Sequence, residues 1–450
     1  LRRAGTDCRR EAEETQFRRI KFHLNTIHVN PKEKDPMKPT LSPQAQAAQT
    51  ISRNMKLISH NELTGFGGVG EGINMQVTKD GRRILWLAHE SAPKNFTGVD
   101  VTDVKNPKVI VQTDLPHERV RSNSLDVVGD IMAVAYQTKK TGDKPAGMDL
   151  FDISTPEKPK LISHFDASGP HSRGAHCVWF VDGEYVHLTS GSEDFEPTHP
   201  NDFQFYRIID VRNPSKPVEV GRWHYPGTHK GDKEAPPPRH PRFDGGYRPH
   251  NINVYPERPD RAYMAYLDGG AVILDISDKS NPKMVTNWKY SPPFNGFCHT
   301  VMPLFGRDLM IVTDECTKDD GIDWPKLGFV VNASVETNLV PVSTLPLPPV
   351  ENFSKRGGRY GAHNLHENLP GPASFRSNTI VFGTFFNGGV RAFDTSNPYQ
   401  PQEIAYFVPG KPAMSPKSSV QINDVWVDEN GLVYAVDRFG GGLYVIEMTA

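Results

Sequence analysis

From about residue 55 onward, apolar and polar residues alternate in short runs that are separated by turn-forming residues. The stretch HCVWFVDGEYVHLTS at 176–190 is typical, with two alternating runs joined by a D-G turn. This arrangement predicts a β-hairpin. After residue 50, no long stretch has the spacing of an amphipathic helix. The pattern therefore predicts an all-β chain built from many short strands.

One unit recurs within this pattern. Each copy has an apolar pair, an Asp, another apolar residue, a polar turn that ends in Pro, and a second β-rich run. Clear copies occupy residues 99–111, 150–163, 208–220, 273–285 and 392–404, a degenerate copy occupies 330–342, and a truncated copy occupies 443–450. With the strand signals upstream of each copy, every unit offers four strands at a period of roughly 50–70 residues, which indicates the blades of a β-propeller.

The pentapeptide KLISH occurs twice, at 56–60 and at 160–164. The second copy is the outer strand of its unit, whereas the first has no unit before it. Because the seventh unit ends before its outer strand, we expect Met55–His60 to supply that strand and close the ring, which also pairs an exposed sheet edge. The sequence thus predicts a seven-bladed β-propeller at 55–450, preceded by a mobile, charge-rich arm at 1–54.

The repeated segments, of which LFDISTPEKPKLIS at 150–163 is an example, resemble those of the LVIVD-repeat family of β-propellers. The resemblance covers residues 55–450. It implies a propeller, often with seven blades. It implies little about chemistry, because a fold of this kind carries many unrelated functions.

Composition narrows the classes of partner. The chain has 51 basic and 53 acidic residues and a net charge of −2, so nothing points to nucleic acid. No apolar stretch approaches the roughly 20 residues of a membrane-spanning helix. Four cysteines are too few and too scattered for a disulfide scaffold. We therefore expect a soluble, cytoplasmic protein, with a periplasmic or cell-surface location as the alternative if a leader has been removed.

The inner strand of each propeller blade faces the central tunnel, so its first residues lie at the tunnel mouth. Aligning the seven units places one polar residue of each at this position: Asn74, Asn123, His176, His250, His299, His363 and Asn423. Four imidazoles at one level oppose each other's protonation, and a divalent metal relieves that crowding. Without a carboxylate among these positions, Fe, Mn, Cu or Zn is favoured over Ca or Mg. The alternative is one ancestral histidine that was copied with the repeat and kept for structural hydrogen bonds.

The four histidines belong to adjacent units, so a metal would lie off the tunnel axis. The side that carries Asn74, Asn123 and Asn423 would then stay open for a substrate, since open coordination positions distinguish catalytic from structural sites.

Charged residues lie near the same mouth. Four acidic residues fall in loops that open on this face, namely Glu90, Asp268, Asp314 and Glu315. We expect Asp268 to accept a hydrogen bond from His250, and Asp314 or Glu315 to do so from His299. Arg173, Arg248 and Arg359 precede inner strands and form a basic collar that would attract an anion. The alternative for all of these residues is a solvated loop position.

Two hypotheses follow. The first is a metal-dependent enzyme of the oxygenase, lyase or isomerase type, with one transition metal on the four histidines and a small, anionic organic substrate. Five charged residues would assist catalysis: Asp268, Asp314, Glu315, Arg248 and Arg359. Arg173 and Glu90 would line the substrate pocket together with the three asparagines. The second is a non-catalytic propeller that acts as a binding or cell-surface interaction module. Only the first requires a stoichiometric metal.

Overall fold

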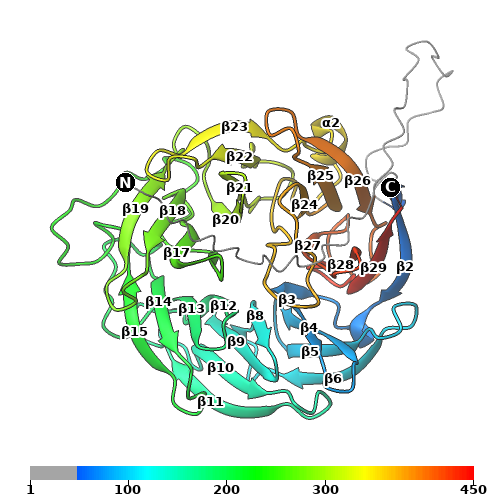
Figure 1. The fold of residues 1–450 in the computed structure, drawn as a ribbon, viewed down its shortest axis with the longest axis horizontal. Helices are drawn as coiled ribbons and strands as arrows, with labels where there is room; N and C mark the ends of the chain where they lie inside the picture. Colours follow the sequence, from blue (N-terminus) through cyan, green and yellow to red (C-terminus); the bar gives the residue numbers. More distant parts are fainter. Residues whose placement is uncertain (1–47, 450) are drawn as a thin grey trace, which may run out of the picture. The chain divides into compact units, whose positions relative to one another are not determined.

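The computed structural model describes residues 48–449, whose regular structure is almost entirely β. Seven sheets are arranged radially around a central axis, and the chain visits them in order (Figure 1). The protein is a seven-bladed β-propeller, as the repeats predict.

Four blades follow the expected four-strand pattern within one stretch of chain. Blade 1 contains β3 (Val69–Val77), β4 (Arg83–His89), β5 (Lys94–Asp100) and β6 (Lys108–Asp114). Blade 3 contains β12 (Ala175–Trp179), β13 (Tyr185–Ser190), β14 (Phe205–Asp210) and β15 (Val218–Trp223). Blade 4 contains β16 (Ile252–Tyr255), β17 (Arg258–Ala265), β18 (Ala271–Asp275) and β19 (Lys283–Trp288). Blade 5 contains β20 (Cys298–Leu304), β21 (Leu309–Asp314), β22 (Gly328–Asn332) and β23 (Val340–Thr344).

The other three blades depart from this pattern. In blade 2 the inner strand is split, giving β7 (Val120–Arg121), β8 (Leu125–Val128), β9 (Ile131–Thr138), β10 (Gly147–Asp152) and β11 (Lys160–Asp166). Blade 6 contains β24 (Ile380–Thr384), β25 (Val390–Asp394), β26 (Gln402–Val408) and β1 (Ile51–Arg53). Blade 7 contains β27 (Ile422–Val427), β28 (Leu432–Asp437), β29 (Leu443–Met448) and β2 (Met55–Asn61). Two short helical turns, a 3-10 turn (Leu63–Gly65) and α2 (Val350–Phe353), lie in connections.

The Asp that recurs in every clear repeat is a turn residue. Its side-chain oxygen accepts a hydrogen bond from the backbone N–H two residues later, at 2.7–3.0 Å, in all five copies: Asp100, Asp152, Asp210, Asp275 and Asp394. In the degenerate copy Asn332 makes the same bond at 2.9 Å. An Asx-turn of this kind reverses the chain between the third and fourth strands. The most regular feature of the repeat therefore serves folding.

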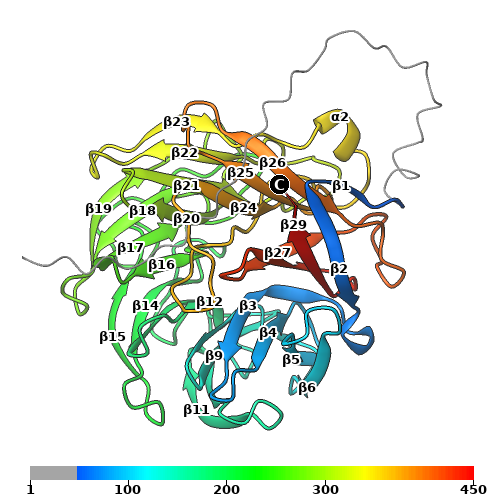
Figure 2. The same cartoon turned by 45° about the vertical axis from the view of Figure 1, so that its right-hand side comes forward.

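The two KLISH segments occupy equivalent outer strands. β2 pairs antiparallel with β29 from Met55 opposite Met448 to Asn61 opposite Leu443, so the first copy completes blade 7 (Figure 2). In both copies the serine hydroxyl donates a hydrogen bond of 2.6 Å to a turn of the next blade, Ser59 to Val104 O and Ser163 to Pro214 O. In each copy this hydrogen bond attaches the outer strand to the next blade, and the first copy also closes the ring.

Two features differ from the expectations. Residues 51–53, which were assigned to the mobile arm, form β1 and pair with β26; the arm up to residue 47 lies outside the described residues. The inner segment of blade 6, around His363, is not a regular strand, although His363 N and His366 N donate to Thr384 O and Phe382 O at 3.0 Å. This segment runs beside β24 but does not form a continuous ladder of hydrogen bonds with it.

Apolar side chains fill the spaces between neighbouring blades. Between blades 1 and 2, for example, Ile84, Trp86 and Phe96 pack with Met132 and Val134 in a fully buried cluster. This packing fixes the blades around the tunnel and so fixes their inner ends. Over residues 48–449, no helix has the length and apolar character needed to cross a membrane.

Candidate metal centre

Four histidines from four adjacent blades meet at the tunnel. His176 lies on β12, His299 on β20 and His250 just before β16, while His363 lies on the irregular inner segment of blade 6, beside Thr384 of β24. Between consecutive imidazoles, the ring centroids are 4.2, 3.9 and 4.4 Å apart. The Nε2 atoms of His176 and His250 are 2.7 Å apart. All four residues are at most 5% exposed.

The opposite nitrogen of every ring, Nδ1, faces an oxygen. The four acceptors are Gln137 Oε1 for His176 (3.1 Å), Asn251 Oδ1 for His250 (2.8 Å), Thr300 Oγ1 for His299 (2.9 Å) and the backbone oxygen of Asn423 for His363 (2.7 Å). An oxygen acceptor at Nδ1 places the proton there and leaves a lone pair on Nε2, which is the tautomer that binds metals. The 2.7 Å between Nε2 of His176 and Nε2 of His250 is a hydrogen-bond distance when one ring keeps its Nε2 proton, and a shared cation would take the place of that proton.

A carboxylate that the sequence analysis did not select completes this donor set. Glu71 Oε2 lies 3.9, 3.6 and 3.6 Å from Nε2 of His176, His250 and His299, and its Oε1 lies 3.6 Å from Nε2 of His363. Bond lengths of 2.0–2.2 Å place the ligand atoms of one metal roughly 3–4 Å apart. Nε2 of His299 and of His363 is buried without a hydrogen-bond partner among the described residues. The residues fit a transition metal with mixed nitrogen and oxygen ligands.

Two glycines explain the position of Glu71. The pairing of β3 with β4 shifts register between Val69 and Ile73, and the chain there approaches blade 2 closely. A Cβ atom at Gly70 would lie 2.6 Å from Asn123 O, and one at Gly72 would lie 2.3 Å from Leu125 N. Only glycine on both sides lets this segment bring a carboxylate to the axis. The expectation of a site without a carboxylate is therefore wrong, since it assumed a regular strand that begins at Asn74.

A ring of ion pairs surrounds the donors. Glu315 lies 3.9 Å from Nε2 of His250 and 3.7 Å from Nε2 of His363, and it accepts a hydrogen bond of 2.5 Å from Arg359. Arg438, also not selected from the sequence, lies 3.3 Å from Glu71 and donates to Asn423 Oδ1 at 2.9 Å. These contacts hold the carboxylates against the histidines.

Glu90, which was expected to line the substrate pocket, instead links two arginines. It accepts hydrogen bonds from Arg121 at 2.5 Å and from Arg438 at 2.6 Å. These contacts tie the inner ends of blades 7, 1 and 2 together, one layer outside the histidines.

A cavity of about 150 Å³ opens over the histidines, and five arginines line it: Arg121, Arg173, Arg248, Arg359 and Arg438. Within residues 48–449, Arg173 and Arg248 have no carboxylate partner; both lie against the face of Phe203, at 5.3 and 4.8 Å. Arg248 Nε is buried without a hydrogen-bond partner. Burial and the neighbouring guanidinium lower the pKa of Arg248 to about 10, so it remains cationic at neutral pH. The cavity thus offers two free positive charges to an anion.

Burial favours the neutral form of three of the four histidines. Burial lowers the pKa of His176 well below its ordinary value and that of His250 to about 4, and it also lowers the pKa of His299. Burial opposes ionisation of Glu315, but the nearby His363 and Arg359 outweigh it and lower the pKa to about 2. The centre therefore combines three imidazoles that favour the neutral form with an ionised carboxylate.

Two predicted partners of the histidines do not reach them. Asp268 accepts hydrogen bonds from the backbone N–H groups of Gly245 (2.8 Å) and Gly246 (3.3 Å), not from His250. Asp314 accepts a hydrogen bond of 2.5 Å from the Tyr290 hydroxyl, not from His299. The expected hydrogen bonds do not form because Asn251 and Thr300, the residues directly after His250 and His299, already contact the Nδ1 atoms.

The asparagines expected beside the substrate are also placed differently. Asn74 donates a hydrogen bond of 3.1 Å to Asp126, away from the mouth. The side chain of Asn123 is fully buried and does not line the cavity above the histidines. Asn423 lies beside His363 and Arg438 as a support. These positions do not form an open substrate side.

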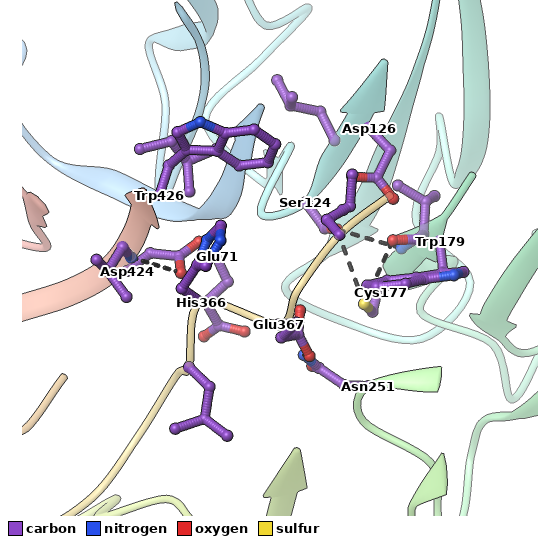
Figure 3. A pocket seen from close by; sticks show the side chains of 16 residues that line it. Glu71, Ser124, Asp126, Cys177, Trp179, Asn251, His366, Glu367, Asp424 and Trp426 are labelled. Atoms are coloured by element: carbon purple, nitrogen blue, oxygen red, sulfur yellow. Dashed lines mark hydrogen bonds between the residues drawn. The ribbon is translucent and has the colours of Figure 1, made fainter. Parts of the chain in front are cut away.

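A second, smaller chamber of about 40 Å³ lies along the tunnel on the other side of Glu71, which lines both spaces. Figure 3 shows Asp126, Glu367 and Asp424 around it, together with Cys177 and His366. Burial raises the pKa of Glu367 to about 7 and raises those of Asp126 and Asp424 well above the ordinary value. Burial thus favours the protonated form of these three carboxyl groups, whereas the pKa of Glu71, beside the histidines, is lowered.

Comparison with known proteins identifies the repeat and the fold. The model of the LVIVD repeat matches residues 205–224 and 260–289. The chain carries LVIVD repeats. A search of curated proteins found no match. A crystal structure of a protein from Lactobacillus plantarum is similar at 10% identity, with a TM-score of 0.50, over 75% of this chain and 85% of the other. The Cps50 (Swd1) β-propeller domain of Myceliophteria thermophila is similar at 13% identity, with a TM-score of 0.50, over 84% and 96% of the two chains.

At these identities the similar structures indicate the fold alone. The matched LVIVD repeats contain the turn residues Asp210 and Asp275, but none of the four histidines and not Glu71. The repeats specify the blades, whereas the donor set lies on the segments that lead into inner strands.

Proposed function

We propose that this LVIVD-repeat propeller is a metal-dependent enzyme that acts on a small, anionic organic substrate at the mouth of its tunnel. One divalent transition metal would be held by His176, His250, His299, His363 and Glu71. The supporting observation is the shared arrangement of the four imidazoles, each with an oxygen at Nδ1 and with Nε2 3.6–3.9 Å from a carboxylate oxygen of Glu71. Among the described residues, His299 and His363 leave Nε2 buried without a hydrogen-bond partner, whereas His366 uses both nitrogens, with Val427 N and Phe375 O.

The protein side chains have separate roles in this proposal. Arg173 and Arg248 bind and orient the anionic group of the substrate, because they lack a carboxylate partner among the described residues. The cavity of about 150 Å³ equals the share of about five water molecules in the liquid, so the substrate is small. Glu315, fixed by Arg359 and ionised, accepts hydrogen bonds from the substrate.

A bound transition metal supplies a Lewis acid, or a redox centre if it is Fe, Mn or Cu. Oxygenase, lyase and isomerase reactions are all compatible with such a centre. The presence of Glu71 among the donors favours Fe, Mn or Zn over the softer ion Cu(I), since carboxylate is a harder ligand than imidazole.

Elemental analysis of the full-length protein, purified without a metal-binding tag, tests this proposal. We expect about one central transition metal per chain, lost in His250→Ala and His299→Ala and retained in His366→Gln, a tunnel histidine outside the donor set. Near-ultraviolet circular dichroism checks that all variants are folded. Equal metal content in wild type and both ring variants, after reconstitution with Fe, Mn, Cu and Zn, would leave the interaction-module hypothesis as the working one.

A further inference from the structure

A second cluster of metal-binding side chains lies away from the tunnel, in the connection between blades 3 and 4. His224 directly follows β15, and His229 and Asp232 lie in the turn after it. Their donor atoms, one from each residue, all lie within 4.8 Å of one another. The cluster shares no residue with the central site.

The carboxylate of Asp232 is oriented toward the two histidines. Its Oδ2 accepts hydrogen bonds from the backbone N–H groups of Gly227 at 2.8 Å and His229 at 3.2 Å. Its Oδ1 lies 3.0 Å from His224 Nε2 and 3.8 Å from His229 Nδ1. One oxygen is thus used by the backbone and the other is left for both imidazoles.

These distances fit one shared ion better than two hydrogen bonds. A separation of 3.8 Å is too long for a hydrogen bond. Ligand atoms around a tetrahedral zinc ion with bonds of 2.0–2.2 Å are roughly 3.3 Å apart, and the two measured values lie on either side of this. An ordinary His224–Asp232 ion pair would account for the first distance but not for the position of His229.

The surroundings hold the two rings in place. Phe195 packs against both imidazoles, with ring centroids at 5.6 Å from His224 and 5.0 Å from His229. The side chains of the two histidines remain about one third exposed, at 31% and 32%, so an ion and a water ligand can enter from the open side.

We propose that His224, His229 and Asp232 form a second, peripheral metal site that takes Zn²⁺ with water as the fourth ligand. Two imidazoles and one carboxylate are a common ligand set of zinc. The backbone of the turn pairs with the loop of blade 3, since Thr198 N donates to Thr228 O and Lys230 N donates to Glu196 O, both at 2.8 Å. Zinc would therefore join the end of β15 to this turn, which already pairs with the loop of blade 3.

Zinc titration of the full-length, metal-free protein tests this site. We expect His224→Ala, His229→Ala and Asp232→Asn each to bind one zinc ion fewer than wild type. His240→Ala, which removes a histidine of the same connection outside the cluster, should bind as many as wild type. Bound zinc should also slow tryptic cleavage after Lys230, which is 59% exposed, in wild type but in none of the three variants.

The outcome is independent of the central site. If the central histidines bind no metal, wild type should still bind one zinc ion that His224→Ala loses, and His250→Ala should retain it. Equal zinc stoichiometry and equal tryptic rates in wild type and the three folded variants would overturn the proposal.

Discussion

The histidines of the centre depend on the residues directly beside them. Asn251 and Thr300 follow His250 and His299 in the chain and fix their Nδ1 atoms. The side-chain nitrogen of Asn251 then donates a hydrogen bond of 2.9 Å to Glu367, in the chamber below. A single side chain thus connects His250 to a buried carboxyl group.

Glu367 makes folding stability depend on pH. Burial raises its pKa from 4.5 to about 7, so between these values the folded chain holds a proton that the unfolded chain has lost. The free energy of unfolding therefore falls as pH rises through this window, by about 3 kcal/mol for this group at 1.36 kcal/mol per pKa unit. Glu367→Gln should remove this part of the dependence, because glutamine is neutral and can accept the same hydrogen bonds from Asn251 and Asn253.

Urea unfolding of the metal-free protein at pH 5 and pH 7.5 measures the effect. The difference between the two free energies should be smaller in Glu367→Gln than in wild type. Glu118→Gln, at an exposed position, should behave as wild type. A variant with the full wild-type dependence would show that Glu367 ionises normally in the fold.

At the scale of elements, β2 carries the closure of the ring. Met55 is 4% exposed and belongs to the apolar cluster shared by blades 6 and 7, whereas Leu57, two residues later, is 39% exposed. Met55→Ala should lower the free energy of unfolding by about 2–5 kcal/mol, as for other buried methionines. Leu57→Ala should change it by less than about 0.5 kcal/mol.

Chemical denaturation shows whether β2 stabilises the whole ring or can detach from it on its own. Because β2 joins the two ends of the ring, the loss in Met55→Ala should appear in the main transition measured by tryptophan fluorescence. A separate early transition, with the main one unchanged, would mean that β2 can detach while the other blades stay folded.

Regular elements were predictable from the sequence because they follow a repeat. The turn Asp residues and the two KLISH segments each occupy one position in the blade, so the alignment that found them also found the blades. The same alignment located His176, His250, His299 and His363, which begin inner segments. Glu71 breaks the alignment, since its position depends on the close approach allowed by Gly70 and Gly72. The available signal was the two glycines on either side of a glutamate, G-E-G, near the start of an inner strand.

Charged partners were less predictable than elements. Asp268 and Glu315 follow second strands and Asp314 ends one, yet only Glu315 reaches the histidines. The difference depends on which backbone N–H groups and hydroxyls lie nearby, such as Gly245 N and the Tyr290 hydroxyl. Such contacts form between segments that are far apart in the chain, and they do not recur from one repeat to the next.

At the scale of the whole molecule, every blade contributes to one central network. Blades 3, 4, 5 and 6 supply the histidines, and blade 1 supplies Glu71. Blades 7 and 2 join through Arg438 and Arg121, which both bind Glu90. A metal at this centre would connect five blades directly, and it would be lost on unfolding because the unfolded chain has no such site.

Metal binding should therefore stabilise the propeller as a unit. A ligand at about a thousand times its Kd adds about 4 kcal/mol to the free energy of unfolding, so the metal-loaded protein should unfold at a higher temperature than the chelator-treated protein. The difference should disappear in His299→Ala, which lacks a central ligand, and persist in His224→Ala, which alters only the peripheral cluster. Calorimetry of the loaded and stripped forms measures it. Equal melting temperatures in wild type would mean that the blades hold the histidines together without help from an ion, and the ring would then be a structural feature of the tunnel.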